Sequence, residues 1–428
     1  MGAAASDTYS RAARRSSGIC EMKAAGPAFA GPAAAISPQP EEIGARWSWG
    51  GLVRWRQATY GARDSAVGPG ETHMPYLHSH RMLAVAGATC LAATAVFAVP
   101  ATAEKPRSGS STGTGQVFKV NPVQSSGDQS LTDQKDAAGA VPGSAYAQVQ
   151  LRNLDGSGRL IGRWVNVRSS TGDAAYSPTN TFLYNRHDDR FEQVMAYFWV
   201  NEAQEYLQSL GFGSSLRPVN AESQDVRLNQ YGIDNSFSWD KHDYIRLGKG
   251  GVDDAEDAEV IVHEYGHAVH DAQVPGYGAS LDAGAIGEAF GDYLAVTVGL
   301  STASRYGWPV LAPEPCVADW DSISYTSTVP HCLRRIDSGL VLEDRRNQVH
   351  YDGMIWSQAL WDIRQRYVAL GLTTRDWDRT LIDSQFGYAP DTSFSEAAEV
   401  TYQKALDTQG AAVAAAVRAG FAARHIYF

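Results

Sequence analysis

The segment His263-Glu264-Tyr265-Gly266-His267 places two histidines four residues apart, with a glutamate directly after the first. On a helix, residues four apart lie on one face, so both imidazoles can reach one Zn²⁺ ion. Glu264 would stand beside that ion and act as a general base toward a water molecule. The flanking apolar residues predict a buried helix, in which these polar groups are costly without a metal. The spacing therefore predicts a catalytic zinc site.

A catalytic zinc site needs a third protein ligand and one open position. A third histidine six residues after the second is excluded, because Gln273 occupies that position. The segment GAIGEAFGD (284–292) supplies carboxylates instead, and Glu288 and Asp292 share one helix face. We expect Glu288 to bind the metal and Asp292 to accept a hydrogen bond from the outer N–H of a ligand histidine.

His270 lies on the same predicted helix as the two ligand histidines. As a fourth ligand it would close the position that a substrate needs. We therefore interpret His270 as a partly buried, hydrogen-bonded structural residue.

The elements that must position these groups are β-like first and helical afterwards. Alternating residues from Tyr146 to about 170 predict a hairpin with an Asp-Gly turn, and 190–210 predict a long helix. From about 254, helical periodicity dominates: helices are expected at the zinc motif, at GAIGEAFGDYLAVTVGL and at GMIWSQALWDIRQRYVAL, with a last pair beyond Thr374. The predicted fold class is α+β, and the predicted zinc site lies near the boundary between the β-rich and the helical regions.

These motifs resemble the gluzincin peptidases. GAIGEAFGD is similar to the third-ligand segment of thermolysin, while HEYGH, VHYDGMIWSQALWDI and the acidic DDAEDAE are more similar to the fungalysin branch; the resemblance covers about 180–425. It implies a thermolysin-like, two-lobed metallopeptidase, with a β-rich N-terminal lobe, a mainly α-helical C-terminal lobe and the active-site cleft between them. The implied enzyme is a zinc metalloendopeptidase with one catalytic Zn²⁺, acting on peptide or protein substrates.

The same resemblance implies roles for two further residues. His350 matches the histidine that donates a hydrogen bond to the oxyanion of the tetrahedral intermediate. Asn235, in Asp-Asn-Ser-Phe, matches the substrate-binding asparagine of an edge strand, against the alternative of a turn asparagine. Tyr277 does not align with the oxyanion-binding tyrosine of thermolysin. No calcium-ligand pattern of thermolysin is recognised, and a Ca²⁺ site has only candidate ligands in Asp253, Asp254 and Asp257.

The N-terminal region has the composition of an export signal. Arg81, a short apolar run from Met82 and the small residues up to Ala103 predict a signal peptide and hence a secreted, extracellular protein. Cys316 and Cys332 would be the two cysteines left after cleavage, which predicts a disulfide between them. The predicted divisions are 1–73 (a non-native or disordered extension), 74–103 (signal peptide), 104–145 (linker or short pro-segment), 146–253 (β-rich lobe) and 254–428 (helical zinc-binding lobe).

The net negative charge of the chain after signal cleavage limits the classes of molecule that it can bind. Residues 104–428 carry 27 Lys/Arg and 41 Asp/Glu, an acidic balance that argues against nucleic acid as a partner. We expect a monomer with no stable membrane insertion after signal cleavage. The predicted function is hydrolysis of peptide bonds by a zinc-activated water with Glu264 as general base. The alternatives are a catalytically inactive secreted binding protein on a gluzincin scaffold and a zinc hydrolase for a non-peptide bond.

Overall fold

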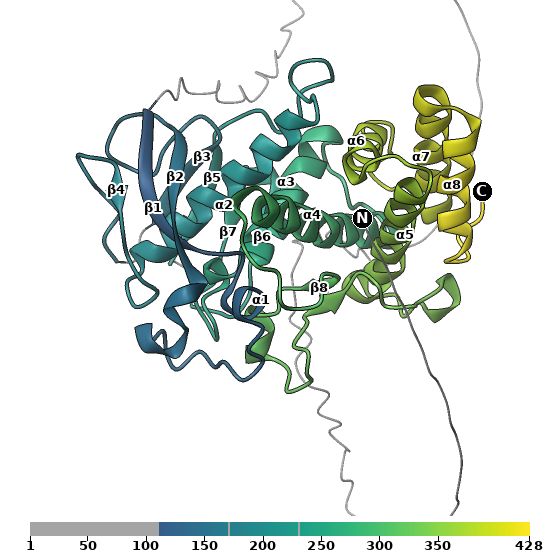
Figure 1. The fold of residues 1–428 in the computed structure, drawn as a ribbon. Coiled ribbons are helices and arrows are strands. Elements are labelled where there is room, and N and C mark those ends of the chain that lie inside the picture. Colours follow the sequence, from purple (N-terminus) through teal and green to yellow (C-terminus); the bar gives the residue numbers. More distant parts are fainter. Residues whose placement is uncertain (1–110, 170–171, 230–231) are drawn as a thin grey trace, which may run out of the picture. The chain divides into compact units, whose positions relative to one another are not determined.

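Most strands lie in the first half of the described chain and most long helices in the second, although the long helix 190–209 lies among the strands (Figure 1). A computed structural model describes residues 111–428, except 170–171 and 230–231. The predicted extension 1–73 and signal peptide 74–103 lie outside the described residues. The strands are β1 (Ser111–Phe118), β2 (Tyr146–Leu154), β3 (Val165–Ser169), β4 (Thr181–Phe182), β5 (Gln224–Leu228), β6 (Phe237–Trp239), β7 (Tyr244–Arg246), β8 (Cys316–Val317) and β9 (Arg334–Arg335). The helices are α1 (Pro122–Ser126), α2 (Arg190–Ser209), α3 (Ala258–Gln273), α4 (Leu281–Tyr306), α5 (Val349–Ala369), α6 (Thr374–Gln385), α7 (Phe394–Gln409) and α8 (Ala411–Ala422).

The described strands form three sheets. One has the order β2-β1-β4, the second has the order β3-β5-β7-β6, and β8 pairs with β9. In the four-stranded sheet, β3, β5 and β7 are parallel, whereas β6 is an antiparallel edge strand. Strand β6 therefore has one side that no described strand occupies, and that side can accept an extended peptide.

The predicted hairpin of 146–170 forms only beside its Asp-Gly turn, where Leu154 and Gly162 make an antiparallel bridge, and the two strands pair elsewhere. Strand β2 pairs antiparallel with β1, which lies in the segment 104–145 that we expected to be a linker or pro-segment. Strand β3 belongs to the other sheet, beside β5. The Ser/Gly/Thr-rich sequence of β1 conceals the strand, because only its end, Val117 and Phe118, is apolar and buried. Pairing is decided by which strand completes the core, and local alternation does not carry that information.

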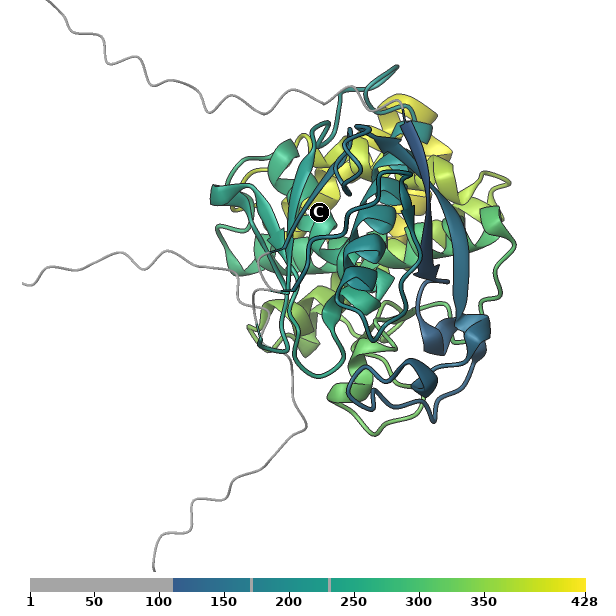
Figure 2. The same ribbon diagram turned by 90° about the vertical axis from the view of Figure 1, so that its left-hand side faces the viewer.

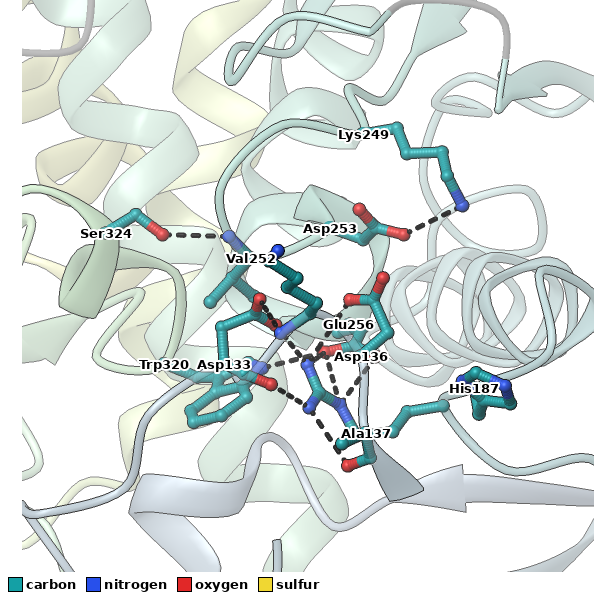
Figure 3. Close-up of polar contacts among 12 residues, drawn as sticks. Asp133, Asp136, Ala137, His187, Lys249, Val252, Asp253, Glu256, Trp320 and Ser324 are labelled. Carbon is teal, nitrogen blue, oxygen red and sulfur yellow. Dashed lines mark hydrogen bonds and ion pairs between the residues drawn. The ribbon is translucent and has the colours of Figure 1, made fainter. Parts of the chain in front are cut away.

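A buried ion pair ties the rest of this segment to the body of the protein (Figure 3). Arg186 donates through Nε to Glu256 Oε1 at 2.9 Å and through Nη2 to Glu256 Oε2 at 2.8 Å. The same guanidinium binds Asp133, through its backbone oxygen at 2.6 Å and its carboxylate at 2.5 Å. Trp320 Nε1 donates to Glu256 Oε2 at 3.1 Å. Residues 111–145 are therefore part of the folded structure.

Helices α3 and α4 pack closely because small residues face each other at their contact. A Cβ on Gly266 would lie 2.9 Å from Gly291 Cα, and a Cβ on Gly291 would lie 2.7 Å from His263 Nδ1. Both distances are shorter than van der Waals contact, so these positions need glycine. The Gly266–Gly291 approach brings the imidazole of His263 directly against α4.

One hydrophobic core extends through both halves of the described chain. Its buried residues run from Val117 in β1 to Ile426 near the C-terminus. Helices α6, α7 and α8 cover the side away from β1 and β2, and in Figure 2 these strands (blue) lie in front of the yellow C-terminal helices. The expected α+β architecture, β-containing first and helical second, is confirmed. The division between residues 253 and 254 remains a prediction.

The helical half also differs from expectation in one detail. The pair of helices predicted beyond Thr374 is in fact three helices, α6, α7 and α8, since Gly410 separates α7 from α8. Helix α7 begins with a capping box: the Ser393 hydroxyl accepts from the backbone N–H of Glu396, whose carboxylate accepts from the backbone N–H of Ser393. Among the described residues, no helix has both the length and the apolar character needed to cross a bilayer.

Candidate active site

Helix α3 brings the two histidines of the motif together. The Asp257 side chain caps its N-terminus by accepting the backbone N–H of Glu259 at 2.9 Å. His263 and His267 are one turn apart, and their rings meet edge to face with centroids 4.8 Å apart. Their Nε2 atoms lie 3.1 Å apart. Both imidazoles therefore point the same ring nitrogen at one position.

Glu288 of α4 completes the group. Its Oε2 lies 3.3 Å from His263 Nε2, and its Oε1 lies 3.7 Å from His267 Nε2. Two ligands each about 2.1 Å from a tetrahedral metal are about 3.4 Å apart, so the three donors have the separation that one Zn²⁺ requires. The two nitrogens and one carboxylate are also the ligand types of catalytic zinc, and these residues fit the metal.

Asp292 and Arg334 orient His263 through its Nδ1, the ring nitrogen that does not face the three converging donors. Asp292 Oδ1 lies 2.9 Å from His263 Nδ1. Arg334 of β9 donates through Nε to Asp292 Oδ2 at 2.7 Å and through Nη2 to Oδ1 at 2.6 Å. Burial alone would raise the pKa of Asp292, but the charge and hydrogen bonds of Arg334 lower it to about 2. An ionised Asp292 holds the ring proton on Nδ1 and leaves the Nε2 lone pair for a metal.

The sequence analysis predicted Asp292 but missed Arg334. Its strand has only two residues and no recognisable pattern. The nearest sequence signal is Cys332, two positions earlier, which is disulfide-bonded to Cys316 as predicted. Cys316 begins β8, the partner strand of β9, so the disulfide joins β8 to the segment just before β9, which carries Arg334.

Glu264 is a buried carboxylate next to His263 on helix α3. It is 1% exposed, and neither carboxylate oxygen has a hydrogen-bond partner in the described structure. Burial raises the pKa of Glu264 to about 8. A nearby cation would lower that pKa, because it would stabilise the carboxylate. The unpaired Glu264 therefore also fits a metal held by its neighbours.

His350, in the first turn of α5, faces the same group. Its Nε2 lies 3.4 Å from Glu288 Oε2. Gln348 Oε1 accepts from the backbone N–H of Tyr351, so its amide nitrogen faces His350 Nδ1, at 2.8 Å, and donates to it. This arrangement places the proton of the neutral ring on Nε2. Burial lowers the pKa of His350 to about 4, and a neutral ring points an N–H into the site.

His270 and Tyr277 lie together, away from the three converging donors. Their ring centroids are 4.2 Å apart, and His270 also packs against Phe290 at 4.8 Å. Burial lowers the pKa of His270 to about 3. His270 is 1% exposed, which is more buried than expected, and the described structure shows no hydrogen bond to either ring nitrogen. The expected hydrogen-bonded role is therefore wrong, because the ring sits in an aromatic cluster.

Asn235 precedes the edge strand β6. Its side chain is buried at 7% exposure, its backbone N–H donates to the carbonyl of Ile233 at 3.0 Å, and its Oδ1 has no partner among the described residues. The predicted link between Asn235 and an edge strand thus has a structural basis, and its role in substrate binding remains a prediction.

Comparison with known proteins shows which family this part of the chain resembles. Residues 229–389 match the model of the fungalysin metallopeptidases. This part of the chain is fungalysin-like. The fungalysin-like part contains all the donors described above, together with Glu264, Arg334 and His350, and the resemblance stated from the motifs is confirmed.

Solved structures are similar in addition. One of them is the precursor of protealysin, a metalloproteinase from Serratia proteamaculans, with 15% identity and a TM-score of 0.45, covering 61% of this chain and 86% of that chain. No curated protein matches the chain.

Proposed function

We propose that this protein is a secreted zinc-dependent endopeptidase. The observation that carries the proposal is the convergence of His263, His267 and Glu288 beside the unpaired carboxylate of Glu264, within the fungalysin-like part of the chain. The family match supports a zinc peptidase. The disulfide between Cys316 and Cys332 supports export, because such bonds persist in oxidising compartments.

His263, His267 and Glu288 would hold the zinc ion. When bound, zinc supplies a Lewis acid that polarises the scissile carbonyl and lowers the pKa of a water. Glu264 accepts the proton of the attacking water and passes it to the leaving nitrogen. Asp292 and Arg334 keep the His263 ring in the tautomer that this arrangement requires.

His350 and Asn235 act on the substrate. The Nε2–H of His350 donates to the oxyanion that forms when water adds to the carbonyl. Asn235 and strand β6 bind the peptide backbone in extended form along the unpaired side of the strand. Backbone hydrogen bonds of this kind hold many sequences, which accords with an endopeptidase.

Casein hydrolysis at neutral pH tests the proposal. We expect the purified protein to contain one zinc per chain and to cleave casein. Chelation should abolish cleavage and one equivalent of zinc should restore it, because the ligands converge on one ion. A protein without bound zinc would contradict the site. Bound zinc without cleavage of casein or other peptides would instead support the binding-protein or non-peptide hydrolase alternatives.

Replacing His350 tests the oxyanion contact. We expect His350→Phe to lower kcat by about 10²–10³-fold, with little change in KM or zinc content, because the ring's N–H acts on the transition state and the ring is not one of the three ligands. Steady-state kinetics on a fluorogenic peptide would measure this. The matched control is His425→Phe, since His425 is exposed and pairs with Glu343 at 2.7 Å. Unchanged kcat in His350→Phe would exclude the assignment.

A further inference from the structure

Three acidic side chains form a second group, separate from the three residues that would bind zinc. One carboxylate oxygen from each of Asp234, Asp254 and Asp321 lies within 4.8 Å of the others. Asp254 and Asp321 are each 1% exposed, and Asp234 is partly buried. Of the calcium candidates chosen from the sequence, only Asp254 belongs to this group. Asp257 caps α3, and Asp253 pairs with Lys249 at 3.3 Å.

The buried members lack the partners that buried carboxylates normally have. Both oxygens of Asp321 and Oδ1 of Asp254 have no hydrogen-bond partner in the described structure. Asp254 Oδ2 accepts from the hydroxyl of Ser236, and Asp234 Oδ1 accepts from the hydroxyl of Tyr325. These bonds leave the oxygens of Asp321 unsatisfied.

No positive side chain of the described chain neutralises the group through an ion pair. Arg334 is the cation whose charge acts on Asp321, but its guanidinium binds both oxygens of Asp292. Uncompensated burial of like charges costs several kcal/mol, and such groups normally take up protons or bind a cation. A protonated Asp321 would still need an acceptor for its O–H, and the described residues offer it no hydrogen bond.

We propose that Asp234, Asp254 and Asp321 bind a hard divalent cation of the Ca²⁺ type. All three donors are carboxylates, the ligands that Ca²⁺ prefers, and the group has none of the nitrogen or sulfur donors that favour zinc. Ca–O distances of about 2.3–2.6 Å place ligand oxygens up to about 5 Å apart, so the observed separations suit one shared ion. Water and nearby backbone oxygens would complete its coordination.

The ion would join three segments that surround the zinc site. Asp234 directly precedes Asn235 and strand β6, and Asp254 begins the short 3₁₀ helix Asp254–Glu256 that leads into α3. Asp321 begins the 3₁₀ helix Asp321–Ser324, between β8 and β9. One bound ion would therefore fix the edge strand, the start of the zinc helix and the segment leading to Arg334 with respect to one another. We expect the effect of calcium to be a higher stability of this assembly.

The test compares two isosteric substitutions, Asp321→Asn and Asp319→Asn. Asp319 is equally buried and lies two residues earlier, but its charge interacts with Asp257 and Glu259. Each full-length protein is stripped with a chelator, reloaded with one equivalent of zinc, and titrated with CaCl₂ by calorimetry. Thermal unfolding is followed with and without CaCl₂. Glu264→Gln is present in every sample to prevent self-digestion, so the readout is independent of peptidase activity.

We expect the parent protein to bind Ca²⁺ and its Tm to rise by about 3–8 °C at saturation. Asp321→Asn should weaken binding by at least about tenfold, while in the absence of Ca²⁺ it should unfold no earlier than the parent, because the substitution removes like-charge repulsion. Asp319→Asn should keep the calcium response. Loss of the response in Asp319→Asn alone, an equal shift with MgCl₂, or no binding by the parent would each overturn the proposal.

Discussion

Replacing Glu264 with glutamine is expected to leave zinc bound and to lower kcat by about 10²–10⁴-fold. Glutamine has nearly the same shape but cannot accept the proton of the attacking water. The zinc ligands are unchanged, because Glu264 is not among the three converging donors. Folding should be preserved, since both carboxylate oxygens lack partners in the described structure and the substitution breaks no bond there. Zinc content and peptide hydrolysis are measured on the same samples.

The control for this experiment lies on the same helix. His270 is as buried as Glu264, with both ring nitrogens unpartnered among the described residues, and it packs against Tyr277 and Phe290. We expect His270→Phe to keep zinc and most of the activity, because phenylalanine preserves this aromatic packing. If Glu264→Gln retains activity, or if His270→Phe loses zinc, the roles assigned along α3 are wrong.

Replacing Arg186 with methionine should lower the free energy of unfolding by about 3–5 kcal/mol. Methionine fills much of the same space but leaves the carboxylate of Glu256 buried with only Trp320 as a side-chain donor. It also frees Asp133, which Arg186 binds through backbone and carboxylate oxygens. Figure 3 shows the side chains of Asp133, Glu256 and Trp320 close to one another. Urea unfolding followed by tryptophan fluorescence measures the change.

Two further variants make the Arg186 prediction specific. Arg190→Met is the matched control, because Arg190 forms a local ion pair with Asp188 in which both side chains are about one-third exposed, and such pairs contribute about 1 kcal/mol or less. The double variant Arg186→Met with Glu256→Gln should be more stable than the sum of the single effects predicts, because each single variant leaves a buried partner behind. Strict additivity would contradict a direct pair.

The zinc ligands were predictable because helical geometry is local. Two histidines four residues apart on a helix share a face whatever surrounds them, and the same rule pairs Glu288 with Asp292. Both pairs lie on helices in the structure, and the two helices meet where Gly266 and Gly291 allow close approach. Glu288 was chosen as the third ligand from the segment 284–292 itself, and the resemblance to fungalysin, now matched over 229–389, covers the same residues.

Other parts of the site depended on packing between distant segments. Arg334 reaches Asp292 across 42 positions of sequence, and the acidic group of Asp234, Asp254 and Asp321 joins three separate segments. Strand β1 was read as linker because its polar sequence lacks a pattern until β2 pairs with it. By itself, the sequence determined which residues share a helix face and hence the likeness to a zinc peptidase. Only the tertiary structure decided the strand partners, the pairing of buried charges and the convergence of the three aspartates, because these depend on long-range contacts that no local periodicity encodes.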